Sequence, residues 1–176
     1  NGAVTNFSNG TINTTGSLAG SLTNQTSGTV TLGSGITGNV TNDGTLSTTM
    51  IAGTTVTNAS NGNLTATGGI AASVTNSGTL STTSINGATI TNNSGGDLTA
   101  TAGITGNVSN TGTLSTTTMA GSNVNNTASG DLTATGGITA SVSNAGTLTT
   151  TSINGATVNN AGAGTLNATV GITANV

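Results

Sequence analysis

Aliphatic residues recur along this chain in groups of three, and a new group begins every 16 or 18 residues. In each group the first aliphatic residue is followed two residues later by Asn, and the second is preceded two residues earlier by Gly. We call the rows formed by the first, second and third members of successive groups the first, second and third ladder. A fixed period of this kind is typical of repeat architectures, in which each repeat is one structural unit.

The three ladders run through ten groups. The first ladder consists of Val4, Leu22, Val40, Val56, Val74, Ile90, Val108, Val124, Val142 and Val158, with Val176 opening an eleventh group. The second ladder consists of Ile12, Val30, Leu46, Leu64, Leu80, Leu98, Leu114, Leu132, Leu148 and Leu166. The third ladder consists of Leu18, Ile36, Ile51, Ile70, Ile85, Ile104, Met119, Ile138, Ile153 and Ile172. No single group can bury its own apolar residues, so the groups must stack as coils of a solenoid.

Three apolar positions per coil predict three short strands, with their inward side chains stacked on the next coil. A helical solenoid is excluded because Gly, Thr and Asn form helices poorly and no stripe with a period of 3.6 residues is present. We therefore expect an all-β solenoid of about ten coils, alternating between 16 and 18 residues. With strands ~4.8 Å apart, ten coils make a rod about 48 Å long.

Pairs of coils form a longer repeat of 34 residues: Gly44-Thr-Leu recurs at Gly78, Gly112 and Gly146. The repeat is clearest from residue 40 to residue 176, and we expect one domain over residues 1–176. Neither end carries an evident cap of the kind that solenoids use. We therefore expect either a segment of a longer solenoid or a subunit that stacks end to end.

The Asn of each coil is predicted to form a hydrogen-bonded ladder, because side-chain amides at equivalent positions of stacked strands bond to one another. This asparagine ladder consists of Asn6, Asn24, Asn42, Asn58, Asn76, Asn92, Asn110, Asn126, Asn144 and Asn160. The Gly that precedes the second ladder, from Gly10 to Gly164, is expected to let the chain turn at positive φ. Both roles are structural.

The composition contains few side chains that could act in catalysis, metal binding or nucleic-acid binding. The chain has no Lys, Arg, His, Cys, Trp, Tyr or Pro, and its only acids are Asp43, Asp97 and Asp131. The hydroxyl groups have no base to activate them, and no clustered His, Cys or carboxylates could hold a metal. Nucleic-acid binding rests on Lys and Arg. We therefore expect no enzyme activity, no cofactor, no metal and no nucleic acid. No run approaches the ~18 apolar residues of a membrane span, so we expect no membrane insertion.

The segments Val74-Thr-Asn-Ser-Gly-Thr-Leu80 and Gly95-Gly-Asp-Leu-Thr-Ala-Thr101 resemble the repeats of filamentous-haemagglutinin-like exoproteins and autotransporter passenger domains. The resemblance covers the whole chain. It implies a right-handed parallel β-helix that is extracellular, displayed at the bacterial surface, and serves adhesion or filament formation. The chain lacks the scattered basic and aromatic residues that those families usually carry. The partners implied are a second copy of the chain or flanking segments of a longer one, together with a surface or glycan.

One outward-facing position is Thr in almost every coil. Because side chains alternate along a strand, the residue three places after the second ladder faces outward. These residues form what we call the threonine column: Thr49, Thr67, Thr83, Thr101, Thr117, Thr135, Thr151 and Thr169. A flat sheet face that carries a regular row of Thr side chains resembles the surface of ice-binding β-solenoid proteins. The simpler interpretation is that Thr suits a solvated strand, and Asp97 and Asp131 favour it.

The leading hypothesis is therefore a structural extracellular β-solenoid, the stalk or subunit of a surface fibre or adhesin. The alternative is an ice-binding protein that uses the threonine column. A third hypothesis is an amyloid-like matrix protein, since stacked Asn and Thr side chains can template further stacking.

Overall fold

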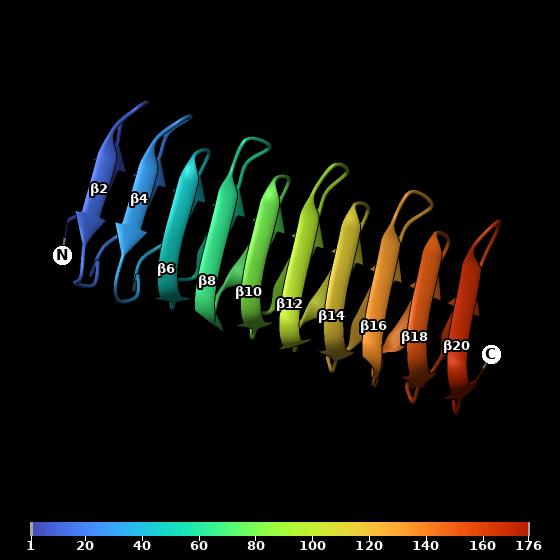
Figure 1. Ribbon diagram of the computed structural model, residues 1–176. Helices are drawn as coiled ribbons and strands as arrows, with labels where there is room; N and C mark the ends of the chain where they lie inside the picture. Colours follow the sequence, from blue (N-terminus) through green and yellow to red (C-terminus); the bar gives the residue numbers. More distant parts are fainter. Residues whose placement is uncertain (1, 176) are drawn as a thin grey trace.

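The computed structural model describes residues 2–175, which form two parallel sheets of ten strands each. The chain alternates between the sheets, so the odd-numbered strands form the first sheet and the even-numbered strands the second. In Figure 1 the second sheet lies in front and its strands run downward, while the first-sheet strands return upward behind them. Since the coils advance from the N to the C terminus in the same view, the path is a right-handed parallel β-helix, as the resemblance implied.

The strands are short in the first sheet and longer in the second. The first sheet consists of β1 (Val4–Asn6), β3 (Leu22–Asn24), β5 (Val40–Asn42), β7 (Thr55–Asn58), β9 (Ser73–Asn76), β11 (Thr89–Asn92), β13 (Asn107–Asn110), β15 (Asn123–Asn126), β17 (Ser141–Asn144) and β19 (Val158–Asn160). The second consists of β2 (Thr11–Thr14), β4 (Thr29–Leu32), β6 (Thr45–Ile51), β8 (Asn63–Ile70), β10 (Thr79–Ile85), β12 (Asp97–Ile104), β14 (Thr113–Met119), β16 (Asp131–Ile138), β18 (Thr147–Ile153) and β20 (Thr165–Ile172).

The number of strands per coil differs from the expected three. From β6 onward, the second and third ladders lie on one strand of the second sheet, as Leu80 and Ile85 do on β10. The strand does not break between them because the chain passes through a bulge, where the register with the neighbouring strand shifts. In the first two coils β2 and β4 are four residues long, and the third ladder makes only isolated bridges, Leu18–Ile36 and Ile36–Ile51.

The alternation of coil lengths begins at Val40, where the 34-residue repeat becomes clear in the sequence. Val4 pairs with Leu22 and Leu22 with Val40, so the first two coils are both 18 residues long. Alternation with 16-residue coils starts at Val40. The longer coils carry two extra residues in the turn after the Asn and one in the bulge, and one residue fewer before the next first-ladder position. In the bulge Gly69 and Gly137 have φ of 122° and 117°. A glycine at positive φ is a common way to accommodate such a bulge.

The ladders form one apolar core between the two sheets. From Leu22 to Val158 every residue of the three ladders is at most 4% exposed. A fourth inward row, which the sequence analysis did not identify, lies two residues after the second ladder. It alternates between buried Ala and buried Thr: Thr48, Ala66, Thr82, Ala100, Thr116, Ala134 and Thr150. Thr82, Thr116 and Thr150 each donate a hydroxyl hydrogen bond of 2.9 Å to the carbonyl oxygen of the Ala one coil earlier.

The repeated Gly has a different role from the one expected. None of the glycines that precede the second ladder has a positive φ. They are required because the coils approach closely at this turn. A Cβ on Gly146 would lie 2.3 Å from the carbonyl oxygens of both Gly130 and Thr127. The Gly therefore allows the backbone of one coil to pass directly over the turn of the coil before it.

Replacing Gly146 by Ala should consequently destabilise the protein. The new methyl group has no room between two backbone oxygens, and overpacking of this kind costs about 1–3 kcal/mol. Gly16 is the matched control, since a Cβ there meets only Thr14 Oγ1 at 3.6 Å. Chemical denaturation monitored by circular dichroism should show a lowered midpoint for Gly146→Ala and an almost unchanged one for Gly16→Ala. Equal midpoints would contradict the close approach.

Candidate functional site

The asparagine ladder runs unbroken through all ten coils. The Nδ2 group of each Asn donates a hydrogen bond to the Oδ1 atom of the Asn in the next coil, at 2.7–2.9 Å. From Asn6 to Asn144 these side chains are at most 4% exposed. Every bond runs in the same direction along the rod. The ladder expected from the sequence is therefore confirmed.

Each Asn also holds the turn that follows it. Asn126 Nδ2 donates to Gly130 O at 3.0 Å within its own coil, and to Thr147 O at 2.9 Å in the next. Among residues 2–175, no buried side-chain nitrogen or oxygen lacks a hydrogen-bond partner. A buried amide without partners is costly, so full satisfaction makes the ladder a specific, stabilising part of the fold. From Asn24 to Asn144 the Asn side chains are consequently closed to any ligand.

The threonine column lies on the outer face of the second sheet, but its members are not equivalent. Thr67, Thr101 and Thr135, in the longer coils, are exposed, whereas their successors in the shorter coils, Thr83, Thr117 and Thr151, are half-buried. Each half-buried Thr donates its hydroxyl to the backbone oxygen of the exposed Thr one coil earlier. Three of the eight hydroxyls of the column are therefore engaged in joining coils rather than free to bind water or a surface.

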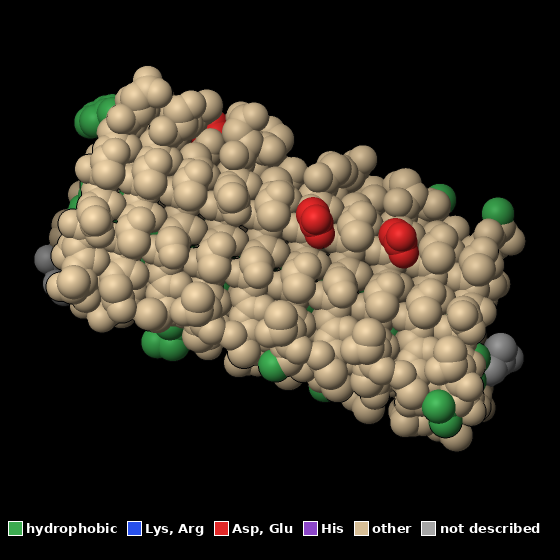
Figure 2. Space-filling view, in the orientation of Figure 1, with side chains coloured by type: hydrophobic (Ala, Val, Ile, Leu, Met, Phe, Trp, Pro, Cys, Tyr) green, Lys and Arg blue, Asp and Glu red, His purple; other side chains and the backbone are tan. Residues whose placement is uncertain are grey.

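The regular part of this face lies beside the column. The residues directly before and after the second ladder pair in register from strand to strand, as Thr79 and Ser81 do with their neighbours on β8 and β12. Their chemistry varies, because Asn63, Asp97 and Asp131 interrupt the row that begins the strands. Figure 2 shows this face as an even, mostly uncharged surface broken by red carboxylates. The threonine column itself lies where the register shifts.

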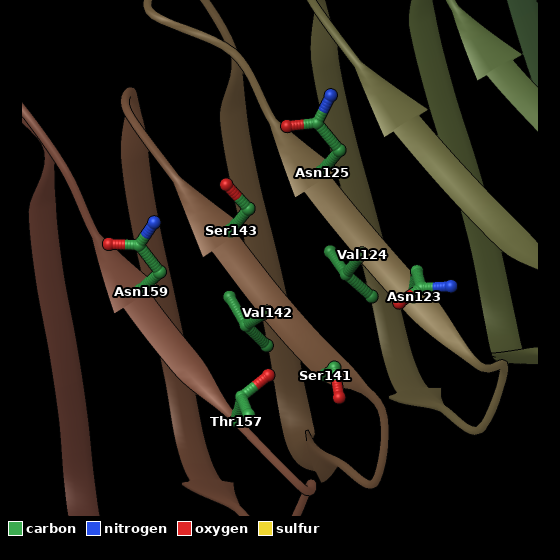
Figure 3. A pocket seen from close by; sticks show the side chains of 8 residues that line it. All are labelled: Asn123, Val124, Asn125, Ser141, Val142, Ser143, Thr157 and Asn159. Atoms are coloured by element: carbon green, nitrogen blue, oxygen red, sulfur yellow. The ribbon is translucent and has the colours of Figure 1, made fainter. Parts of the chain in front are cut away.

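The first sheet carries a shallow polar trough near its C-terminal end. Its volume is about 430 Å³, and its walls come from β15, β17 and the chain around β19. Figure 3 shows two rows of side chains on this surface, Asn125, Ser143 and Asn159 in one and Asn123, Ser141 and Thr157 in the other. Val124 and Val142 lie between the rows, the other lining residues carry amides or hydroxyls, and none carries a charge or an aromatic ring, so the trough offers hydrogen bonds without a fixed anchor.

Asp43 is the one acid whose environment is set by hydrogen bonds. Asn61 Nδ2 donates to its carboxylate at 3.1 Å, and Thr26 Oγ1 donates to it as well. The hydrogen bond from Thr26 is the main reason why the pKa of Asp43 lies below its ordinary value of 3.8. All three residues belong to successive turns at one edge of the rod, so the carboxylate ties turns of neighbouring coils together.

Stability should therefore change little with pH above the acidic range. A carboxyl group with a lowered pKa in the folded state stabilises the fold above its unfolded pKa, and this contribution disappears as the pH falls through the folded pKa. The melting temperature should stay within a few degrees between about pH 5 and pH 9 and fall only below about pH 4. Asp43→Asn should flatten that acidic fall. A shift of tens of degrees above pH 5 would contradict this account.

The described residues contain no group of three or more His, Cys, Asp or Glu placed to hold a metal ion. Asp97 and Asp131 are the first residues of β12 and β16, with β14 between these strands. In residues 2–175 no helix is long and apolar enough to cross a membrane.

Searches among protein families, curated proteins and solved structures found no match to this chain. The resemblance to surface exoproteins therefore rests on the repeats themselves. What the structure establishes is a parallel β-helix repeat protein with a continuous asparagine ladder and Thr-rich strands.

Proposed function

We propose that this chain is a structural extracellular module, the stalk or subunit of a bacterial surface fibre or adhesin. The observation that carries the proposal is the asparagine ladder, which joins all ten coils through buried hydrogen bonds. A solenoid in which each coil touches only its neighbours becomes a rod, and its length is set by the number of coils. Such a rod holds whatever lies at its two ends at a fixed separation.

The surface supports a structural role rather than a catalytic one. Hydroxyl and amide groups cover it, and the sequence contains no side chain that could act as a base beside a Ser or Thr nucleophile. The trough on the first sheet has no charged or aromatic anchor among its lining residues, and three of the eight members of the threonine column donate their hydroxyls to backbone oxygens. The protein in this proposal is not an enzyme and uses no cofactor.

The extracellular location follows from the resemblance to haemagglutinin-like exoproteins. Its partners in this proposal are other copies of the chain, or flanking coils of a longer one, stacked end to end. A glycan or another surface is the kind of ligand that a fibre of this type would meet through its neutral hydroxyl and amide groups.

Labelling of intact cells tests this proposal. Antibodies raised against the purified chain should bind the surface of unpermeabilised cells of the organism that produces it, and immunogold electron microscopy should place the label on thin surface structures. Cells that lack the gene are the control. Label that appears only after permeabilisation would overturn the extracellular role.

Ice binding is the second candidate, and the observation that favours it is the run of eight Thr residues on one sheet face. Thermal hysteresis of the purified chain measures this activity directly. If the face binds ice, Thr101→Lys should abolish hysteresis, whereas Thr75→Lys, at an exposed position of the first sheet, should not. The structural role predicts no hysteresis and no shaping of ice crystals by the unmodified chain.

A further inference from the structure

Two turns that follow the third ladder carry the same dipeptide, Asn86-Gly87 after β10 and Asn154-Gly155 after β18. The Gly is required by packing, since a Cβ on Gly87 would lie 2.0 Å from the carbonyl oxygen of Ala72 in the coil before it. The Asn is not required, because Ala stands at the equivalent place directly after β6 and β14. Both Asn side chains are exposed, so water reaches them.

A Thr hydroxyl from the next coil donates to the side-chain amide in each of these turns. Thr105 Oγ1 donates to Asn86 Oδ1 at 2.9 Å. Thr173 Oγ1 donates to Asn154 Oδ1 at 2.5 Å. A donor placed on an amide oxygen stabilises the negative charge that develops there when a nucleophile attacks the carbonyl carbon. The Cγ atoms of the two Asn side chains are therefore activated towards attack.

The backbone nitrogen of the following Gly is the neighbouring nucleophile. Neither Gly87 N nor Gly155 N donates a hydrogen bond to another backbone group among residues 2–175. The pairs Asn9-Gly10 and Asn61-Gly62 differ, because their Gly nitrogens donate to the backbone oxygen three residues earlier, at 2.8 and 2.9 Å. A nitrogen held in this way must give up its hydrogen bond before it can attack. The structure therefore separates two reactive Asn-Gly pairs from two protected ones.

We propose that Asn86 and Asn154 are sites of spontaneous deamidation in the folded chain. Gly87 N loses its proton to the solvent and attacks Asn86 Cγ, the new N–C bond closes a five-membered succinimide, and the Cγ–Nδ2 bond breaks with release of ammonia. Water then opens the ring and leaves a carboxylate, as aspartate or isoaspartate, and Asn154 reacts in the same way through Gly155 N. The two conversions change the formal charge from −3 to −5 on a chain without Lys or Arg, which disfavours side-by-side association of rods.

Peptide mapping by mass spectrometry tests the two sites. Cleavage before each Asp gives the fragments 1–42, 43–96, 97–130 and 131–176, of which 97–130 has no Asn-Gly pair and is the internal control. After incubation of the folded protein in mildly alkaline buffer, tandem mass spectra should show conversion of the amide to the acid at Asn86 and Asn154. Conversion should be roughly 2- to 10-fold faster there than at Asn61, the rate equivalent of the hydrogen bond that Gly62 N must give up. In denaturant, where the turns are lost, the three sites should convert at similar rates.

Variants of Thr105 test the assistance by the hydroxyl. Thr105→Val removes the donor and keeps the shape, so conversion at Asn86 should slow roughly 2- to 10-fold, whereas Asn154 in the same molecule should be unaffected. Thr105→Ser retains the hydroxyl and should convert as the unmodified chain does. Ala71 stands at the equivalent place after β8, so the fold does not need a hydroxyl there, and circular dichroism checks that both variants are folded.

Three results would overturn the inference. Absence of conversion at Asn86 and Asn154, or equal conversion at Asn61 in the folded chain, would show that these turns do not favour the reaction. A preference that persists in denaturant would assign it to the local sequence instead of the turn geometry. An unchanged rate in Thr105→Val would remove the role of the hydroxyl. None of these results bears on the fibre role, which the cell-labelling experiment tests separately.

Discussion

Replacing Ile104 by Asp should unfold the centre of the rod and cost more than about 4 kcal/mol. Ile104 is 1% exposed and stacks between Ile85 and Met119 in the third ladder. A carboxylate at this position would be buried without a partner, which is among the most unfavourable substitutions in a core. Because each coil is held by its two neighbours, loss of one central coil removes the support of both halves.

Thr101→Ser is the matched control, three residues away on the same strand. Thr101 is exposed. The Thr117 hydroxyl donates to the backbone oxygen of Thr101 and not to its side chain, so the substitution keeps every described hydrogen bond. Its effect should stay within about 0.5 kcal/mol, as for most surface substitutions. Denaturation curves recorded by circular dichroism compare the two variants. Equal losses of β-structure would show that the third ladder is not the core.

Asn126→Ala should have the second largest effect, with a loss of roughly 3–6 kcal/mol. The substitution removes four hydrogen bonds. Asn144 Oδ1 loses its side-chain donor, and Thr147 O loses the bond from Asn126. Asn110 Nδ2 loses one acceptor but keeps Gly112 O and Asp131 O, and Gly130 O keeps the bond from Thr147 N. Since these groups lie in and around the buried ladder, unsatisfied ones add their desolvation cost to the lost bonds.

The preceding residue supplies the control. Asn125 has the same side chain on the same strand, but it points outward, is exposed and lines the polar trough. Asn125→Ala should change the free energy of unfolding by no more than about 0.5 kcal/mol. Hydrogen exchange of the amides of β15 and β17 should accelerate in Asn126→Ala and remain slow in Asn125→Ala. Similar behaviour of the two variants would mean that the ladder does not stabilise the stack.

The ladders and the buried Asn could be predicted from sequence because their repetition is a global constraint. The Asn two residues after each first-ladder position recurs at the same place in ten coils. When the coils stack, each such Asn must therefore contact the equivalent Asn of the neighbouring coils. That argument needs no knowledge of local backbone geometry. It is the reason why the partners of Asn76, for example, were predictable although they lie 16 and 18 residues away.

Local geometry could not be obtained in the same way. Counting apolar positions gave three strands per coil, but the bulge near Ser84 bends the chain without ending β10. The Gly at each turn was ascribed to positive φ, whereas close approach of the coils requires it. The inward position of Thr82 was not predicted. Its alternation with Ala66 and Ala100 in neighbouring coils was the available signal.

The candidate surface was predicted in part. Alternation along the strand correctly placed the threonine column on the outer face of the second sheet. The difference between exposed Thr101 and half-buried Thr117 was not predicted, because it depends on the contact of Thr117 with the coil before it, where its hydroxyl bonds to the backbone oxygen of Thr101.

The length of the rod as a function of coil number tests the central claim most directly. A second copy of residues 74–107, one 34-residue repeat, can be inserted after residue 107 without changing any ladder. Small-angle X-ray scattering should show that the particle lengthens by about 10 Å, two strand spacings, while its cross-section stays constant. Two inserted repeats should lengthen it by about 20 Å. A cross-section that widens with each inserted repeat, or a length that does not increase in equal steps, would contradict a stacked β-solenoid that acts as a structural rod.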